Sequence, residues 1–151
     1  MKEHTYEATI YWTGNKGTGT SDYAAYGREF TLQIPNKPDL LCSADVPFRG
    51  DKTKHNPEDF FLASLSSCHM LFFLDFASRR KIVVDSYIDA ATGVMEKQDG
   101  KTVITRVELC PKVTYASTVP TAEIEAELHH AAHEACFLAN SVKTEISIKL
   151  D

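Results

Sequence analysis

The chain has 151 residues, of which 43% are hydrophobic, and carries a formal net charge of −5 at pH 7. This length fits a single globular domain, residues 1–151, able to bury roughly two thirds of its unfolded surface. No run of lysine or arginine could follow a phosphate backbone, so we expect no nucleic-acid partner. The polar N-terminal residues do not resemble a secretory signal, which predicts a cytoplasmic protein.

Three strands are predicted in the first part of the chain. Residues 5–12 alternate between two faces, and residues 14–21, rich in glycine and threonine, break that pattern. Alternation resumes over residues 30–34 and stops at Pro35. A short third strand is expected over residues 40–44.

A long helix is predicted after a polar loop at residues 45–55. Asn56 suits the N-cap, Pro57 suits the first helical position, and Glu58 and Asp59 complement the helix dipole. The helix is expected to end at the basic residues 79–81.

This helix is apolar on nearly every side. Ser64, Ser66, Ser67, His69 and Asp75 interrupt its apolar sequence, so we expect a central buried helix and no membrane span. A chain of this size cannot easily cover such a helix with its own strands. The pattern therefore predicts a homodimer.

The second half of the chain predicts strands over residues 82–96 and 102–115, joined by a tight turn containing Asp99 and Gly100. A second helix is expected from Thr121 to Asn140, followed by a strand at residues 142–150. The apolar stripe predicted for this helix is Ile124, Leu128, Ala131, Ala135 and Leu138. This order predicts an α+β fold with mostly antiparallel pairing.

The four cysteines, at positions 42, 68, 110 and 136, lack the spacing of a disulfide scaffold or a zinc ribbon. A cysteine without further context is most often a small buried hydrophobe. We interpret Cys42 and Cys110 in this way because neither lies beside an arginine or carboxylate motif.

Cys68 requires a nearby cation or hydrogen-bond donor if it is to react as a thiolate. Arg49 is the leading candidate, held by Glu58, although an ordinary surface salt bridge is the alternative for this pair. Cys136 could condense with a sulfenic acid at Cys68 to form a disulfide, provided that their Cα atoms lie within about 7 Å.

Three segments together resemble the OsmC/Ohr family. They are Asn56-Pro57-Glu58 at a helix start, Ser67-Cys68-His69 inside that helix, and Cys136 near the end of the second helix. The resemblance implies an OsmC-like fold, with antiparallel sheets packed around a central buried helix in an intertwined homodimer.

The same resemblance implies a thiol-dependent peroxidase without a metal or organic cofactor. Its substrates would be organic hydroperoxides, with hydrogen peroxide as a further candidate. Cys68 would be the peroxidatic cysteine and Cys136 the resolving one, with Arg49 and Glu58 organising the site. A dithiol, such as a lipoyl group, would reduce the Cys68–Cys136 disulfide.

The position of the arginine favours the OsmC-like branch. Residues 14–17, where Ohr members carry their arginine, contain none here, whereas Phe48-Arg49 matches the later segment of OsmC-like members. Arg28 is the weaker alternative. The chain departs from the family pattern at Phe137, which replaces a proline, and at Ser141, which lies later than the usual serine.

Two other functions compete with the peroxidase. His129, His133 and Cys136 share one helix face at the spacing of zinc ligands, and His69 follows Cys68. A dimeric protein that binds small apolar molecules without turnover is the second alternative. For a peroxidase, the candidate residues lining an apolar approach path are Phe60, Phe61, Phe72 and Phe73, although aromatic residues at this density more often belong to the core.

Overall fold

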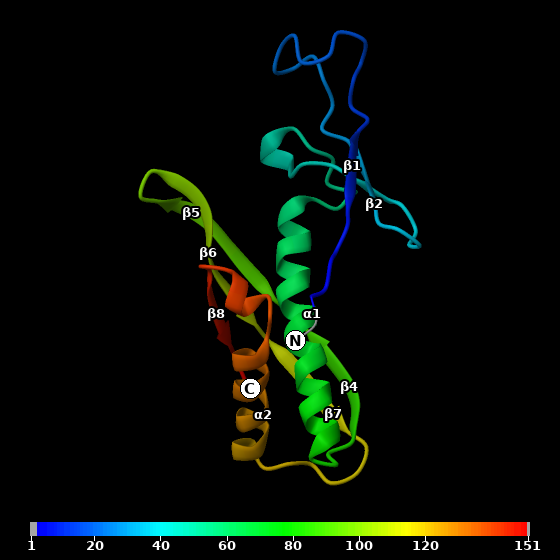
Figure 1. Cartoon of the computed structure of the whole chain (residues 1–151). Helices are drawn as coiled ribbons and strands as arrows, with labels where there is room; N and C mark the ends of the chain where they lie inside the picture. The colour runs from blue at the N-terminus through cyan, green and yellow to red at the C-terminus, as the bar shows by residue number, and fades with distance from the viewer. Residues whose placement is uncertain (1–2, 151) are drawn as a thin grey trace. The chain divides into compact units, whose positions relative to one another are not determined.

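A computed structural model describes residues 3–150, and over these residues it contains two α-helices, two short 3-10 helices and eight strands. The chain divides into two compact units, Met1–Phe60 and Phe61–Asp151, which are described in turn. Helix α1 (Pro57–Arg79) starts in the first unit and continues through the second (Figure 1). The prediction of one domain over residues 1–151 stays a prediction.

The first unit contains an antiparallel sheet with strand order β1-β2-β3. Its strands are β1 (Thr9–Trp12), β2 (Phe30–Gln33) and β3 (Leu40–Cys42). The three predicted strands are thus present, but β1 is shorter than expected. Thr9 pairs with Gln33 at the end of β2, and Pro35 then stops β2 because proline has no backbone N–H to donate.

The start of α1 agrees with the prediction. The Asn56 side-chain oxygen accepts a hydrogen bond from the Asp59 backbone N–H at 2.8 Å, and the Asp59 carboxylate accepts one from the Asn56 backbone N–H at 3.1 Å. This reciprocal pair is a capping box, which satisfies two N–H groups that the helix itself leaves without partners. The helix ends at Arg79, and Lys81 takes a left-handed backbone conformation with φ of 58°.

Residues 82–115 of the second unit form four strands where the sequence predicted two. They are β4 (Val84–Asp89), β5 (Thr92–Gln98), β6 (Lys101–Leu109) and β7 (Pro111–Tyr115). The long hairpin is interrupted where the Asp89 carboxylate accepts the backbone N–H of Cys110 at 2.7 Å, and Pro111 next to it offers no N–H. As a result β4 pairs with β7, and β5 pairs with β6.

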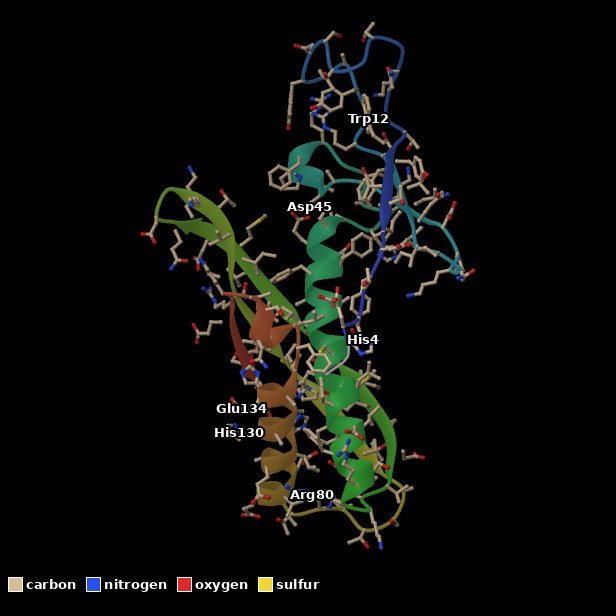
Figure 2. The ribbon with its side chains drawn as sticks, in the orientation of Figure 1. His4, Trp12, Asp45, Arg80, His130 and Glu134 are labelled. Carbon is tan, nitrogen blue, oxygen red and sulfur yellow. The ribbon has the colours of Figure 1, made fainter. Side chains whose placement is uncertain are left out.

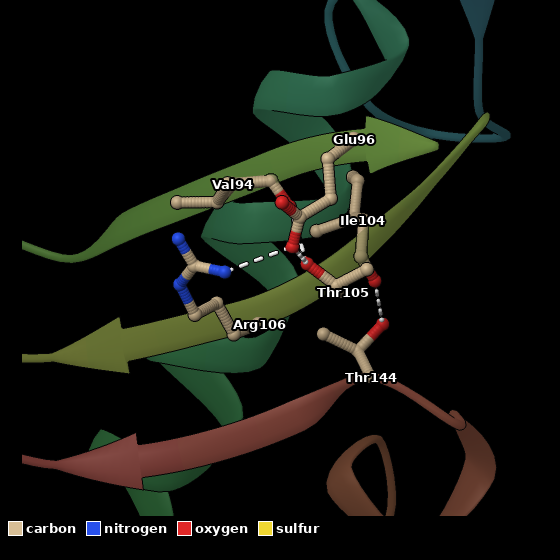
Figure 3. Close-up of polar contacts among 6 residues, drawn as sticks. All are labelled: Val94, Glu96, Ile104, Thr105, Arg106 and Thr144. Atoms are coloured by element: carbon tan, nitrogen blue, oxygen red, sulfur yellow. Dashed lines mark hydrogen bonds and ion pairs between the residues drawn. The ribbon is translucent and has the colours of Figure 1, made fainter. Parts of the chain in front are cut away.

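The predicted tight turn joins β5 to β6. Asp99 and Gly100 both have positive φ, 51° and 77°, as a two-residue hairpin turn requires. The last strand, β8 (Glu145–Ile148), pairs with β6 in parallel, so the sheet order is β5-β6-β8. Figure 3 shows two polar contacts that tie this sheet: the Arg106 guanidinium donates to Glu96 at 2.8 Å, and the Thr144 hydroxyl donates to the Ile104 carbonyl at 2.8 Å.

Helix α2 (Ala122–Ala135) begins where the sequence predicted, with Thr121 as its N-cap, but ends five residues before Asn140. A short 3-10 helix, η2 (Ala139–Ser141), follows it, and the Asn140 side chain donates to the Glu134 carbonyl at 3.0 Å. These contacts turn the chain out of the helix.

The predicted apolar stripe of α2 is wrong in part. The residues of α2 that are buried are Leu128, His129 and Ala132, whereas Ile124 is exposed. Figure 2 shows His130 and Glu134 on the opposite side of the helix, pointing away from α1.

Two apolar clusters form the core of the second unit. In the first, Phe73 and Ala77 of α1 pack against Leu128 and Ala132 of α2. In the second, Leu65 of α1 packs against Val107 and Leu109 of β6. The two helices run antiparallel, and an ion pair between Arg80 and Glu127, 3.1 Å apart, closes the end where α1 finishes and α2 starts (Figures 1 and 2). The predicted α+β class is confirmed.

Helix α1 is buried on one stripe only. The buried residues, Leu65, His69, Phe73 and Ala77, recur every four positions, whereas Leu71 is 62% exposed. Among the helices of residues 3–150, α1 alone is long and apolar enough to cross a bilayer by length and composition, and 22% of that window is buried. Core helices of globular proteins also meet this criterion. One chain therefore leaves much of this apolar helix uncovered.

Candidate active site

The second unit brings the two cysteines of interest together. Cys68 lies on α1 and is half-buried, whereas Cys136 is the C-terminal cap of α2 and is 1% exposed. Cys68 lies close enough to Cys136 to raise the pKa of the Cys136 thiol, and both are free thiols. The pair thus combines one sulfur that solvent can reach with one that it cannot.

Cys136 holds its proton firmly. Burial is the main cause that raises the pKa of this thiol, and the neighbouring Cys68 side chain raises it further. The Ala139 backbone N–H, 3.4 Å from the Cys136 sulfur, acts in the opposite direction. A protonated Cys136 places an S–H donor beside the Cys68 sulfur. Sequence reasoning sought this donor among charged residues and missed the partner cysteine.

A buried histidine pair lies in the same unit. The ring nitrogens His69 Nε2 and His129 Nδ1 are 3.0 Å apart, and the two rings lie within 2° of parallel. Burial lowers the pKa of each to about 4, with a further lowering of the His69 value by His133. The sequence left the roles of these residues open. Alternation and helical periodicity place residues on a face, but they do not identify a partner from another element.

The predicted arginine occupies an unusual backbone position in the first unit. A short 3-10 helix, η1 (Val46–Phe48), is capped by the Asp45 side chain and ends at Arg49, which has a φ of 63°. This left-handed conformation is uncommon for a residue with a Cβ and is most often taken by glycine or asparagine. Gly50 follows, and a Cβ there would lie 1.5 Å from the Ala44 carbonyl oxygen. The turn that carries Arg49 is therefore closely packed.

The two candidate arginines differ in the hydrogen bonds and ring contacts that their guanidinium groups make. The Arg28 guanidinium donates to the backbone carbonyls of Tyr23 and Tyr26 and stacks on both rings. The Arg49 guanidinium lies 5.9 Å from the Tyr23 ring centre, and no hydrogen bond or ion pair engages it within the described part of the first unit. Arg49 thus keeps its donors available, which favours it over Arg28.

Glu58, in the first turn of α1, is half-buried. Within residues 3–60 no ion pair joins it to Arg49, so the expected support of the guanidinium by this carboxylate stays a prediction.

The other two cysteines differ from the pair. Cys42 is fully buried and its thiol donates to the Leu40 carbonyl at 3.3 Å, and burial raises its pKa. At Cys110, burial raises the pKa, and Glu108, 3.6 Å away, acts in the same direction. Both thiols stay protonated at neutral pH, as expected of structural cysteines.

The predicted aromatic approach path is wrong for Phe73. This side chain is fully buried and stacks on the His129 ring, with 4.2 Å between the ring centres. Phe72 instead packs edge-on against Phe137, whose ring centre lies 5.0 Å away and whose side chain is 61% exposed. Because Phe137 directly follows Cys136, this second aromatic pair is the apolar surface nearest in sequence to the buried thiol.

The zinc alternative gains no support from the arrangement of these side chains. Over residues 3–150, no three His, Cys, Asp or Glu side chains come together in a way that could hold a metal ion. The Nδ1 atom of His129 is engaged by His69.

Comparison with known proteins identifies the family. The model for OsmC-like proteins matches residues 50–151, which include every proposed site residue except Arg49. None of the curated proteins matches the chain. Among solved structures, an OsmC-like protein of unknown function from Vibrio cholerae is 36% identical, with a TM-score of 0.91 over 99% of this chain and 100% of that one.

More distant structures share the fold. An organic hydroperoxide resistance protein from Elizabethkingia anophelis is 20% identical, with a TM-score of 0.73 over 99% of this chain and 95% of that one. The organic hydroperoxide resistance protein OhrB of Bacillus subtilis is also 20% identical, with a TM-score of 0.70 over 98% of each chain. The family match, the 36% identity and the shared fold lead to one conclusion: this chain belongs to the OsmC-like family.

Proposed function

We propose that the protein is a thiol-dependent peroxidase that reduces organic hydroperoxides through Cys68 and Cys136. The observation that carries this proposal is the close pair of free thiols, one half-buried and one fully buried. Such a pair suits a nucleophile that meets the substrate and a second thiol that meets only the oxidised nucleophile. Two structural relatives, both 20% identical, are named as organic hydroperoxide resistance proteins.

The proposed reaction begins at the Cys68 thiolate. Its sulfur attacks the distal oxygen of the hydroperoxide, the O–O bond breaks, and the departing alkoxide takes a proton to leave as an alcohol. Cys68 is then a sulfenic acid. Arg49 stabilises the negative charge that develops on the departing oxygen, and Glu58 orients Arg49.

The second step consumes the sulfenic acid. The Cys136 sulfur attacks the Cys68 sulfur, the S–O bond breaks, and the Cys136 proton leaves with the hydroxide as water. An external dithiol of the lipoyl type then reduces the Cys68–Cys136 disulfide by thiol exchange and is itself oxidised to a disulfide. Such a cycle needs a reducing compartment, in keeping with a cytoplasmic location.

The proposed assembly is a homodimer. The uncovered sides of α1, with Leu71 62% exposed, and the exposed Phe137 support a second copy as the cover for this apolar surface.

The test measures loss of an organic hydroperoxide in the presence of excess dithiol. We expect Cys68→Ser to abolish turnover and Cys136→Ser to complete a single turnover that ends in a sulfenic or sulfinic acid. Cys110→Ser is the matched control, because Cys110 is also half-buried and is expected to be dispensable. Equal peroxide consumption by wild type and Cys68→Ser would reject the proposal and favour a binding protein without turnover.

A further inference from the structure

The buried histidine pair has a defined hydrogen-bonding geometry. His69 Nε2 and His129 Nδ1 are 3.0 Å apart in nearly parallel rings, and the side chains are 1% and 2% exposed. Phe73 stacks on the His129 ring with 4.2 Å between ring centres. The pair therefore joins α1 to α2 in a buried aromatic environment, through one specific nitrogen of each ring.

Two histidines at these buried positions are expected to stabilise the fold less than two apolar side chains would. Two neutral histidines carry two ring N–H groups, but the bond between them uses only one. The outer nitrogens, His69 Nδ1 and His129 Nε2, are buried and have no partner among the described residues. Whichever tautomers are present, one buried N–H lacks an acceptor, which is costly. Two apolar side chains of similar size would avoid that cost.

The histidines flank the cysteines along both helices. His69 directly follows Cys68 on α1, and His129 precedes Cys136 by seven residues, close to two turns of α2. The helices thus meet at two neighbouring side-chain pairs, the two thiols and the hydrogen-bonded imidazoles. Two such links restrict both the sliding and the rotation of one helix against the other.

We propose that the His69–His129 hydrogen bond positions the two cysteines for disulfide formation, holding α2 in the register that keeps Cys136 against Cys68. This inference rests on the proposed function. A disulfide requires its two Cβ atoms to lie about 3.5–4.5 Å apart, so a small shift between the helices removes the attack geometry. The histidines donate no proton to the step, since the Cys136 proton leaves with the hydroxide of the sulfenic acid.

The atoms engaged allow a crossed substitution test. Asparagine can place an amide atom near the Nδ1 position of a histidine, whereas glutamine can place one near Nε2. At position 129 the bonding atom is Nδ1, so His129→Asn keeps the link and His129→Gln loses it. At position 69 the bonding atom is Nε2, so the order reverses, and His69→Gln keeps the link while His69→Asn loses it.

The first readout does not involve peroxide. The equilibrium between dithiol and disulfide at Cys68 and Cys136 is measured in a glutathione redox buffer. We expect the two variants that lose the link to form the disulfide less favourably by roughly tenfold or more, and the two that keep it to lie within about threefold of wild type. A second readout is single-turnover kinetics, in which the same two variants slow the conversion of sulfenic acid to disulfide but not the first oxidation of Cys68.

Leu128→Ala is the matched control for general loosening. Leu128 adjoins His129, is fully buried and packs in the cluster with Phe73 and Ala77, and has no polar atom to offer His69. If Leu128→Ala shifted the disulfide equilibrium as much as His129→Gln does at equal stability, the proposal would be overturned. It would also be overturned if the Asn and Gln variants behaved equally at both positions. Because the redox equilibrium contains no peroxide, its result is separate from a failure of the proposed peroxidase activity.

Discussion

Arg49 holds a left-handed backbone conformation in which glycine is less strained. Replacing it with glycine removes a side chain that forms no hydrogen bond or ion pair within residues 3–60. We expect Arg49→Gly to leave the free energy of unfolding unchanged or to raise it by about 1 kcal/mol. Peroxide turnover, in contrast, is expected to fall by about 100-fold or more, because the developing oxygen charge loses its donor. Urea unfolding and a peroxide assay check the two effects.

Lys81 supplies the matched control for this substitution. It has a φ of 58°, close to the 63° of Arg49, and it follows the end of α1. Lys81→Gly is expected to give the same gain in stability with unchanged turnover. If Arg49→Gly also kept full turnover, Arg49 would have no part in the reaction.

The histidine pair predicts how stability responds to acid. Burial lowers the pKa of His69 and His129 to about 4, below the value of about 6.5 in an unfolded chain. Below pH 6.5 the unfolded state therefore binds protons that the folded state does not. Stability is fully present above about pH 6.5 and is lost as the pH falls towards 4, by on the order of 2–3 kcal/mol for each of the two rings.

Urea unfolding between pH 7 and pH 4.5 measures this loss. His133 and Asp89 also face His69 and act in opposite directions on its pKa, and both remain in every variant. The double variant His69→Gln, His129→Asn removes both titrating rings and is expected to show a shallower decline. An identical decline in wild type and double variant would assign the acid sensitivity to other groups.

At the scale of the element, the η1 turn depends on the missing side chain of Gly50. A Cβ there would lie 1.5 Å from the Ala44 carbonyl oxygen, which is backbone and cannot move aside cheaply. We expect Gly50→Ala to displace the turn that carries Arg49, to lower stability by roughly 2 kcal/mol and to reduce turnover. Unfolding and peroxide assays again provide the measurements.

Gly93 in β5 is the corresponding control. An added Cβ there would meet its nearest neighbours, Leu62 and Val107, at 3.7 Å, which is ordinary van der Waals contact. Gly93→Ala is therefore expected to change stability and turnover little. If Gly50→Ala were as stable and active as Gly93→Ala, the turn would tolerate a Cβ at position 50, and this prediction would be wrong.

At the scale of the whole molecule, the exposed apolar side of α1 bears on the proposed dimer. Leu71 is 62% exposed in one chain, although it lies on the most apolar helix of the sequence. We expect the protein to sediment as a homodimer, and we expect Leu71→Glu to weaken that dimer by placing a charge in an apolar interface. Analytical ultracentrifugation over a range of concentrations measures the shift.

Lys97→Glu is the control for a charge change on the surface, since Lys97 is exposed near the end of the β5–β6 hairpin. It should leave the association unchanged. A wild-type protein that stays monomeric at high concentration would contradict the proposed dimer.

The features that depend on local chemistry could be predicted from the amino-acid sequence. Asn56 and Asp59 start α1 because their side chains satisfy helix N–H groups three residues apart, and Asp99-Gly100 makes a turn because both can take positive φ. The order of strands and helices follows from alternation and from proline and glycine in the same way. The family followed from short motifs whose spacing is also local.

Contacts between residues of different elements became known only from the folded chain. Cys68 and Cys136 lie next to each other although 68 positions separate them in the sequence, and His69 is hydrogen-bonded to His129 of the other helix. The long hairpin divides at Asp89 because a carboxylate takes the place of a strand partner there. Periodicity in the sequence predicts which face of a single element is apolar. These contacts depend on how two elements pack against each other, which is established only when the chain folds.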